Sequence, residues 1–316
     1  MNDTRSTLRS YILAIAVWIA TFVVAMKIGA VTDASVDVLV ELRLPRTLAA
    51  SAIGAGLAVS GAALQALFAN PLCEPYTLGI SSGSALGAVL GASLGLNWMF
   101  SGLVGTAFLG ALLFAGILYL ISLREEVGSL TLLLTGVMMG FLGTSLVSIW
   151  LALSDANGIQ AAILWLFGDL TRVRLDGAVF TFFGVAALCV FIWMRWRDLD
   201  ALLMGEEDAI SMGVEISSVR RRLILLISLM IGLCVSAGGM IGFIGLVIPH
   251  FVRKTVGSLH QRLIPLCAVW GAVALVVSDT LARSAVRPYE LPVGVVTALV
   301  GAPAFLWIMI KRRGIR

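Results

Sequence analysis

The chain has 316 residues, of which 59% are hydrophobic and 13% are charged, and its formal net charge is +4. A soluble domain carries about 25% charged residues, so this composition excludes an ordinary soluble protein and indicates an all-α, polytopic membrane protein. No polar stretch is long enough to fold alone, which predicts a single membrane domain over residues 1–316. Each span needs about 20 apolar residues, which leaves room for about ten.

Apolar runs place the spans at approximately 10–27, 47–69, 76–93, 98–121, 130–152, 176–195, 223–236, 240–252, 263–281 and 292–310. The first run is long and no small-residue cleavage site follows it, so we expect an uncleaved span. Residues 223–252 are too few for two ordinary spans and too many for one, which predicts two short helices meeting near residues 236–239. Residues 159–168 resemble half a span on the outer side. Such broken helices need shielding by protein or by a cavity.

The distribution of basic residues predicts the orientation. If the N-terminus is cytoplasmic, most of the 22 lysines and arginines fall on inner segments, as the positive-inside rule requires. Both termini, and the polar stretch 198–222, are therefore expected in the cytoplasm.

Glycines recur every four residues in the third predicted span, at Gly79, Gly83, Gly87, Gly91 and Gly95. They give the helix one smooth face, on which another helix is expected to pack closely.

Residues 198–222 form the longest stretch that cannot lie in lipid. The stretch holds six acidic residues and ends in three arginines, Arg220–Arg222. Its middle predicts a short helix, because acids follow Gly205 at the start and Gly213 follows the last apolar residue. On its own this helix is either an inert loop or a docking element.

Two energy sources are missing from the sequence. No Gly-x-x-x-x-Gly-Lys phosphate loop occurs, so ATP hydrolysis by that chemistry is excluded. No span carries a clear central carboxylate of the kind that proton-driven carriers use. Four scattered cysteines and two histidines show no metal-ligand spacing, so we expect buried thiols, no metal and no cofactor. The protein is then passive, or a partner supplies the work.

Two further patterns have both a structural and a functional interpretation. Arg43, Arg46 and Arg283 either anchor the spans at the interface or form a cationic outer rim for an acidic partner. The Asn70–Pro75 segment, with two prolines, is either a tight turn or a constriction at the inner mouth of a pore.

Three ordered motifs resemble one family. These are LRLPRTLAASAIGAGLAVSGAALQALFANPLCEPYTLGISSGSALGA, GGMIGFIGLVIPHFVR and ELPVGVVTALVGAPAFLWIMIKRR. They resemble the FecCD-type permeases of bacterial ATP-binding-cassette (ABC) importers, from about residue 40 to the C-terminus. The resemblance implies ten spans, a dimer of permease subunits, two cytoplasmic ATPase subunits and an extracytoplasmic substrate-binding protein. Family cargoes are iron–siderophore complexes, haem and vitamin B12.

The resemblance also implies residue roles. By motif, Arg43, Arg46 and Arg283 match arginines that meet acidic residues of the binding protein in importers of vitamin B12. Asn70 and Leu72 match one part of the cytoplasmic gate, and Ser129 and Leu130 match the other. The coupling helix that seats on the ATPase corresponds to Gly205, Glu206, Glu207, Asp208 and Gly213.

The sequence therefore predicts the permease subunit of an importer in the bacterial inner membrane, carrying an iron chelate or vitamin B12. The expected partners are a second permease copy, the ATPases, the binding protein and lipid, and no nucleic acid. The permease itself is not expected to be an enzyme. The alternative is a secondary carrier or channel that needs no ATPase.

Overall fold

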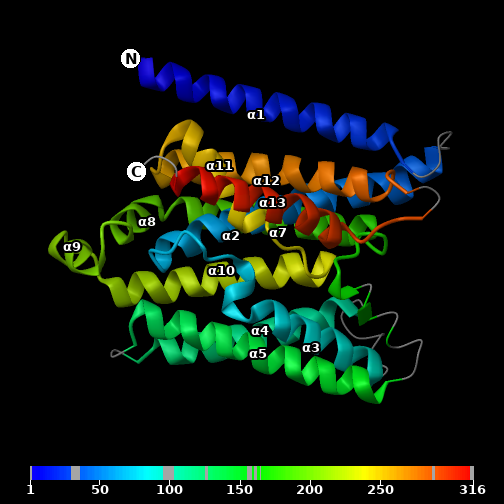
Figure 1. Ribbon diagram of the computed structural model, residues 1–316, viewed down its shortest axis with the longest axis horizontal. Coiled ribbons are helices and arrows are strands. Elements are labelled where there is room, and N and C mark those ends of the chain that lie inside the picture. The colour runs from blue at the N-terminus through cyan, green and yellow to red at the C-terminus, as the bar shows by residue number, and fades with distance from the viewer. Residues whose placement is uncertain are drawn as a thin grey trace.

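The computed structural model describes residues 2–29, 36–94, 103–124, 127–154, 159, 162–163, 165–286 and 289–313. Within these ranges the chain consists of helices and turns, with one isolated β-bridge between Val286 and Tyr289. The long helices run approximately along one axis, and the two ends of the chain lie at the same end of the bundle as α9 (Figure 1). The all-α polytopic fold is thus confirmed.

The helices are α1 (Asn2–Lys27), the π-helix η1 (Val38–Arg43), α2 (Leu44–Leu67), the 3-10 helix η2 (Pro75–Leu78), α3 (Ile80–Ser93), α4 (Leu103–Ser122), α5 (Ser129–Leu153), α7 (Leu175–Trp193), α8 (Trp196–Leu202), α9 (Glu206–Ser211), α10 (Ile216–Gly238), α11 (Ile244–Val256), α12 (His260–Ala282) and α13 (Val293–Arg313). Among the described residues, eight helical segments are long and apolar enough to cross a membrane, with η1 and α2 counted as one. The shorter α3 and α11, of 14 and 13 residues, correspond to the two remaining predicted spans.

Two predicted boundaries are wrong. Residues 216–238 form one 23-residue helix, α10, so the short helix expected over 223–236 is absent and the arginine triplet lies inside the helix. Of the two helices predicted to be short, only α11 is short. The chain reverses between α10 and α11 over Gly239–Phe243, and both end residues of this turn have positive φ. The second span starts earlier than predicted, since η1 runs directly into α2. Of the half-span predicted at 159–168, residues 159, 162–163 and 165–166 are helical, and 160, 161 and 164 lie outside the described residues.

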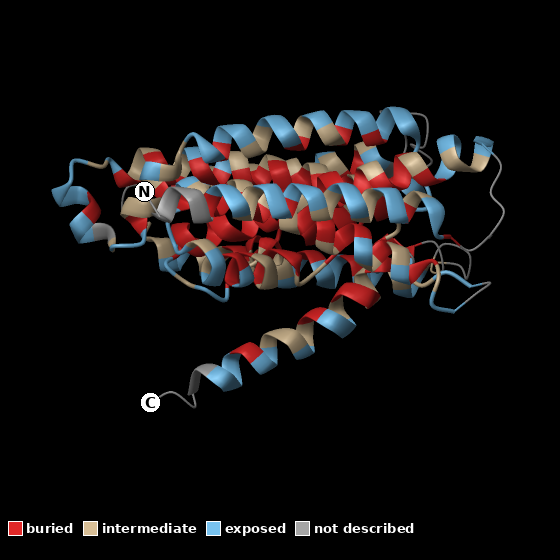
Figure 2. Ribbon diagram, turned by 90° about the horizontal axis from the view of Figure 1, so that it is seen from above, coloured by how far each residue is buried: buried red, intermediate tan, exposed pale blue. Residues whose placement is uncertain are grey.

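Helix α2 lies at the centre of the bundle, because small residues let its neighbours approach closely. A side chain at Gly54 would collide with the backbone of Gly271 in α12, and one at Gly61 with the backbone of Gly245 in α11. This is the small-residue packing typical of membrane helices. Buried residues accordingly fill the middle of the bundle (Figure 2).

Three glycines of the predicted face pack closely on another helix, α4, whereas Gly79 lies just before α3 and contacts α5. Added side chains at Gly83 and Gly87 would meet Gly110 of α4, and one at Gly91 would meet Thr106. Gly95 lies outside the described residues.

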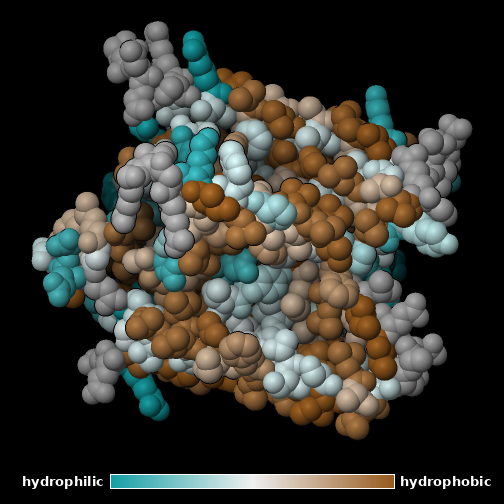
Figure 3. Space-filling view, in the orientation of Figure 1, coloured by the Kyte–Doolittle hydropathy of each residue, from teal (hydrophilic) through white to brown (hydrophobic). Residues whose placement is uncertain are grey.

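The outer surface suits lipid over most of its length. Hydrophobic side chains cover the middle of the face shown in Figure 3, and hydrophilic ones gather towards its two ends. Helices α5 and α13 are among the least buried spans, and α13 leans away from the bundle towards the C-terminus (Figure 2).

Candidate functional site

The short helix α9 projects from one end of the bundle (Figure 1), which we call the α9 end. Gly205 (φ 111°) precedes it and Gly213 (φ 81°) follows it, and both angles favour glycine. The chain therefore enters and leaves the helix sharply, as the sequence predicts.

The outward face of α9 combines charge with apolar area. Ala209 is fully buried and holds the helix against the rest of the chain. Glu207 and Asp208 are exposed, and so are Ile210 (62%) and Met212 (55%). The fifth predicted residue, Glu206, begins the helix.

The polar stretch 198–222, which we call the coupling stretch, is tied to α12 by a side-chain contact that the sequence alone does not predict. Oδ1 of Asp200, in α8, accepts a hydrogen bond from the backbone N–H of His260 (2.8 Å) and lies 2.7 Å from Nδ1 of the same residue. Because His260 is the first residue of α12 and is fully buried, Asp200 both caps that helix and anchors α8 to it.

The segment 70–75, which we call the gate turn, follows α2 at the α9 end. The Asn70 side-chain oxygen accepts a hydrogen bond from the backbone N–H of Leu72 (3.0 Å), which closes a tight turn. The Leu72 side chain is 51% exposed and Cys73 beside it is buried. Burial raises the pKa of the Cys73 thiol to about 11, and burial also raises the pKa of Glu74.

Gln65, in the last turn of α2, holds the gate turn in place. Its Nε2 donates to the carbonyl oxygens of Cys73 (3.3 Å) and Gly245 (3.2 Å), and its side chain is buried. The available signal was the one side-chain amide of α2, in a stretch that is otherwise made of small and apolar residues.

The second predicted gate segment begins α5. Leu130 is 69% exposed, and Ser129 is the first residue of the helix. The two gate segments are connected, because η2 follows the gate turn and packs on α5 where Gly79 meets the backbone of Gly136.

Arg220 joins the coupling stretch to this second segment. Its guanidinium is buried and donates to the carbonyl oxygen of Val127 (2.7 Å) and to Oγ of Ser129 (3.2 Å). The spacing of residues along α10 could have predicted that Arg220 is buried, since it shares one helix face with the buried Ile216, Leu223 and Ile227.

The three predicted docking arginines lie where η1 runs into α2 and where α12 ends, which we call the Arg46 end. All are buried, with exposures of 5% for Arg43, 9% for Arg46 and 3% for Arg283. Arg46 pairs with Asp279 (2.8 Å) and with Glu290 (2.6 Å), and Arg283 lies 3.5 Å from Asp279.

Backbone contacts complete this cluster. Arg43 donates to the carbonyl oxygens of Met26 and Lys27, and Arg283 donates to that of Ala25. The arginines therefore join the end of α1 to α2 and α12, and they face inward in this conformation.

A largely apolar cavity of about 640 Å³ lies beside α13. The described residues that line it carry no charge and come from η2, the loop before α7, the turn before α11 and α13 itself, including Tyr76, Phe167, Met240 and Leu299. Such a cavity has room for a bulky apolar molecule without fixing its orientation.

Comparisons with known proteins identify the family. The model of the FecCD transport family matches residues 8–311. The chain is 38% identical over 305 residues to the vitamin B12 import system permease protein BtuC of Vibrio cholerae, covering 95% of this chain and 89% of that protein. It is 37% identical over 286 residues to the hemin transport system permease protein HmuU of Yersinia pestis, covering 89% and 85%.

A solved structure agrees with the sequence matches. An inward-facing ABC transporter of the metal-chelate type superposes with a TM-score of 0.86 at 31% identity, covering 94% of this chain and 97% of that one. The chain therefore belongs to the FecCD transport family and is a multi-pass permease subunit of a bacterial inner-membrane ABC importer, in which ATP hydrolysis belongs to a separate subunit.

Proposed function

We propose that the chain, acting as one permease domain, imports haem, vitamin B12 or an iron–siderophore complex, with α9 and both termini in the cytoplasm. The relatives that carry vitamin B12 and hemin support a bulky metal chelate as cargo. The uncharged cavity beside α13 supports the same class, because a bulky chelate can pass such walls without strong, specific contacts. Membership in the family favours this function over a carrier that needs no ATPase.

The observation that carries the proposal is the outward face of α9. The exposed helix combines carboxylates with the apolar side chains of Ile210 and Met212, which a partner can bury, so we assign it to a groove on the ATPase. Residues 205–208 and Gly213 form this contact.

Two side-chain links lead from the coupling stretch into the bundle, and one of them ends at the gate residue Ser129. Asp200 moves α12 through His260, and Arg220 moves the start of α5 through Val127 and Ser129. Rigid-body shifts of this kind are a common way to switch a bundle between two states. The gate itself consists of Asn70 and Leu72 with Ser129 and Leu130.

A second copy of the chain completes the pathway. Helices α5 and α13 expose long apolar faces, and the cavity beside α13 lies at the edge of this subunit. A homodimer in which these helices meet covers both faces and encloses the cavity from two sides, with one ATPase under each copy.

The binding protein docks at the Arg46 end in this proposal. Because the three arginines are buried, they hold the shape of this end, and a direct contact with an acidic partner requires the Arg46–Glu290 pair to open. Glu290→Gln then strengthens binding-protein affinity and Arg46→Gln weakens it. Unchanged affinity in both variants argues against a docking role for Arg46.

The experiment is uptake into proteoliposomes that contain the permease, its ATPase and its binding protein. A panel of cobalamin, haem and ferric siderophores is supplied outside, with ATP inside. We expect ATP-dependent uptake of one class only. Full uptake without ATP rejects the importer mechanism, and ATP-dependent uptake of none of the panel rejects the cargo class.

A further inference from the structure

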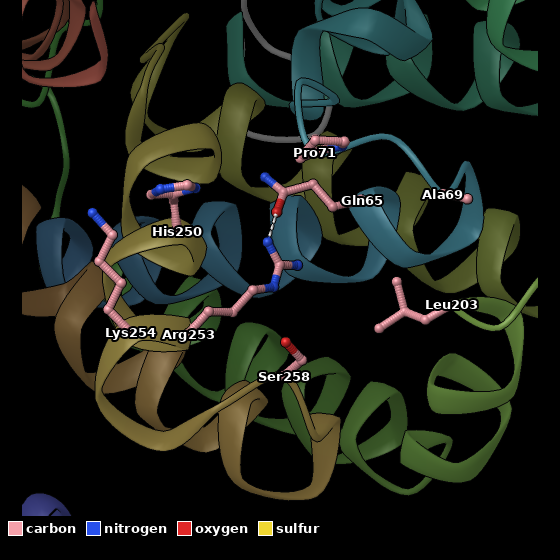
Figure 4. Close-up of a pocket in the computed structure, with 8 residues that line it drawn as sticks. All are labelled: Gln65, Ala69, Pro71, Leu203, His250, Arg253, Lys254 and Ser258. Carbon is pink, nitrogen blue, oxygen red and sulfur yellow. Dashed lines mark hydrogen bonds between the residues drawn. The ribbon is translucent and has the colours of Figure 1, made fainter. Parts of the chain in front are cut away.

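A second cavity, of about 330 Å³, opens at the α9 end, where α2 and α11 finish (Figure 4). Its walls come from four separate parts of the chain: the end of α2, the turn that follows, the end of α8, and α11 with the loop after it. The lining side chains include Gln65, Pro71, Leu203, His250, Arg253 and Lys254.

The charge in this cavity has one sign. Arg253 and Lys254 are cationic, His250 is titratable, and the described lining includes no acidic residue. Figure 4 shows His250, Arg253 and Lys254 along one wall, all from α11, with Pro71 and Leu203 across from it. Such a concave, one-sign surface concentrates anions.

The central cation is held in a fixed position. Nη1 of Arg253 donates to Oε1 of Gln65 at 2.5 Å, drawn as the dashed line in Figure 4. The amide of Gln65 cannot turn over without loss, because its Nε2 donates to the carbonyl oxygens of Cys73 and Gly245. A guanidinium oriented in this way matches the oxygens of a phosphoryl group.

We propose that this pocket binds a phosphoryl group, supplied by the headgroup of an anionic phospholipid or by free phosphate. Lys254 is exposed and adds a second, mobile charge at the mouth.

Occupancy of the pocket has a structural consequence. The same Gln65 that orients Arg253 also holds the Cys73 carbonyl of the gate turn. On the other side, His250 packs edge-on against Phe305 of α13, with 6.4 Å between ring centroids. A ligand on Arg253 therefore stiffens the attachment of the gate turn.

The test measures ligand binding to the purified full-length chain in a zwitterionic detergent. The probes are phosphatidylglycerol, phosphatidylcholine and inorganic phosphate, followed by native mass spectrometry and by the shift in melting temperature. Lys254→Gln leaves the Gln65–Arg253 contact in place, and Arg253→Gln removes it. Arg222→Gln, an exposed arginine in α10 near the same end, is the matched control.

Loss of one charge-assisted hydrogen bond predicts about tenfold weaker binding in Lys254→Gln, with more loss in Arg253→Gln and none in Arg222→Gln. Binding of phosphatidylglycerol without phosphate identifies the lipid as the source, and binding of phosphate alone identifies the free anion. The proposal is overturned if neither probe binds, or if Lys254→Gln and Arg222→Gln bind as tightly as the native chain.

Discussion

Arg220 provides a sharp test of the link between the coupling stretch and the gate. Replacement by methionine keeps most of the apolar stem but removes both hydrogen bonds, to Val127 and to Ser129. A hydrogen bond to a charged group contributes about 1.5–3 kcal/mol. If one such bond carries the coupling free energy, its loss corresponds to about a 10- to 150-fold drop in coupled transport, which lies within the range typical of allosteric coupling.

The assay compares ATP hydrolysis with cargo uptake in proteoliposomes of the complete transporter. We expect Arg220→Met to hydrolyse ATP within about twofold of the native rate while uptake falls at least fivefold. Arg220→Lys restores part of the uptake, because one ammonium donor can still reach the Val127 carbonyl. Arg222→Met removes a neighbouring, exposed arginine and should leave both rates unchanged.

Three results would contradict a coupling role for Arg220. Equal uptake by Arg220→Met and the native protein shows that the hydrogen bonds of Arg220 do not couple the two segments. Equal losses in Arg220→Met and Arg222→Met point to total charge at this end instead. A parallel fall of hydrolysis and uptake, with no rescue by lysine, indicates a folding defect.

Three further predictions concern buried groups. Arg46→Met leaves the Asp279 carboxylate buried without its main partner and should lower the free energy of unfolding by about 3–5 kcal/mol. The double variant Arg46→Met, Asp279→Leu should lose clearly less free energy of unfolding. Detergent unfolding curves measure both variants, and equal losses contradict the pairing. Burial raises the pKa of Glu74, so its contribution to stability is present below the ordinary value of 4.5 and is lost as pH rises through the folded value. Glu74→Gln should therefore be more stable than the native chain between about pH 4.5 and 7. Parallel curves of stability against pH for the two chains refute this prediction. Because Cys73 is buried with a pKa raised to about 11, maleimide should label it slowly at rest and faster during ATP turnover, with Cys73→Ser as the background; a fast, ATP-independent rate contradicts the closed gate turn.

The sequence predicted those features that depend on local rules. Capping glycines defined α9, and the fourfold spacing of glycines in α3 predicted its close contact with α4. Both follow from residues that are neighbours in the chain or on one helix face.

Features that depend on how helices pack were harder to predict. The sequence predicts that Arg43 and Arg46 precede a span, but they lie inside the helical segment, where Asp279, Glu290 and carbonyl oxygens elsewhere in the chain accept their hydrogen bonds. The Asp200–His260 contact joins residues 60 positions apart, and a single sequence does not contain the helix register that brings them together. Gln65 and Arg220 could have been identified from the sequence, because a lone amide in a helix of small and apolar residues and an arginine on a buried helix face are both recognisable signals.

The most direct test of the account is the ratio of cargo taken up to ATP hydrolysed, measured with the native chain and with a chain in which Glu206, Glu207 and Asp208 are replaced by their amides. We predict that the native complex takes up cargo only with ATP. In the variant, hydrolysis by the ATPase continues, uptake is lost and the spans stay folded. Uptake by the variant at the native ratio, or uptake by the native chain without ATP, contradicts the conclusion that α9 delivers the work of a separate ATPase to this permease.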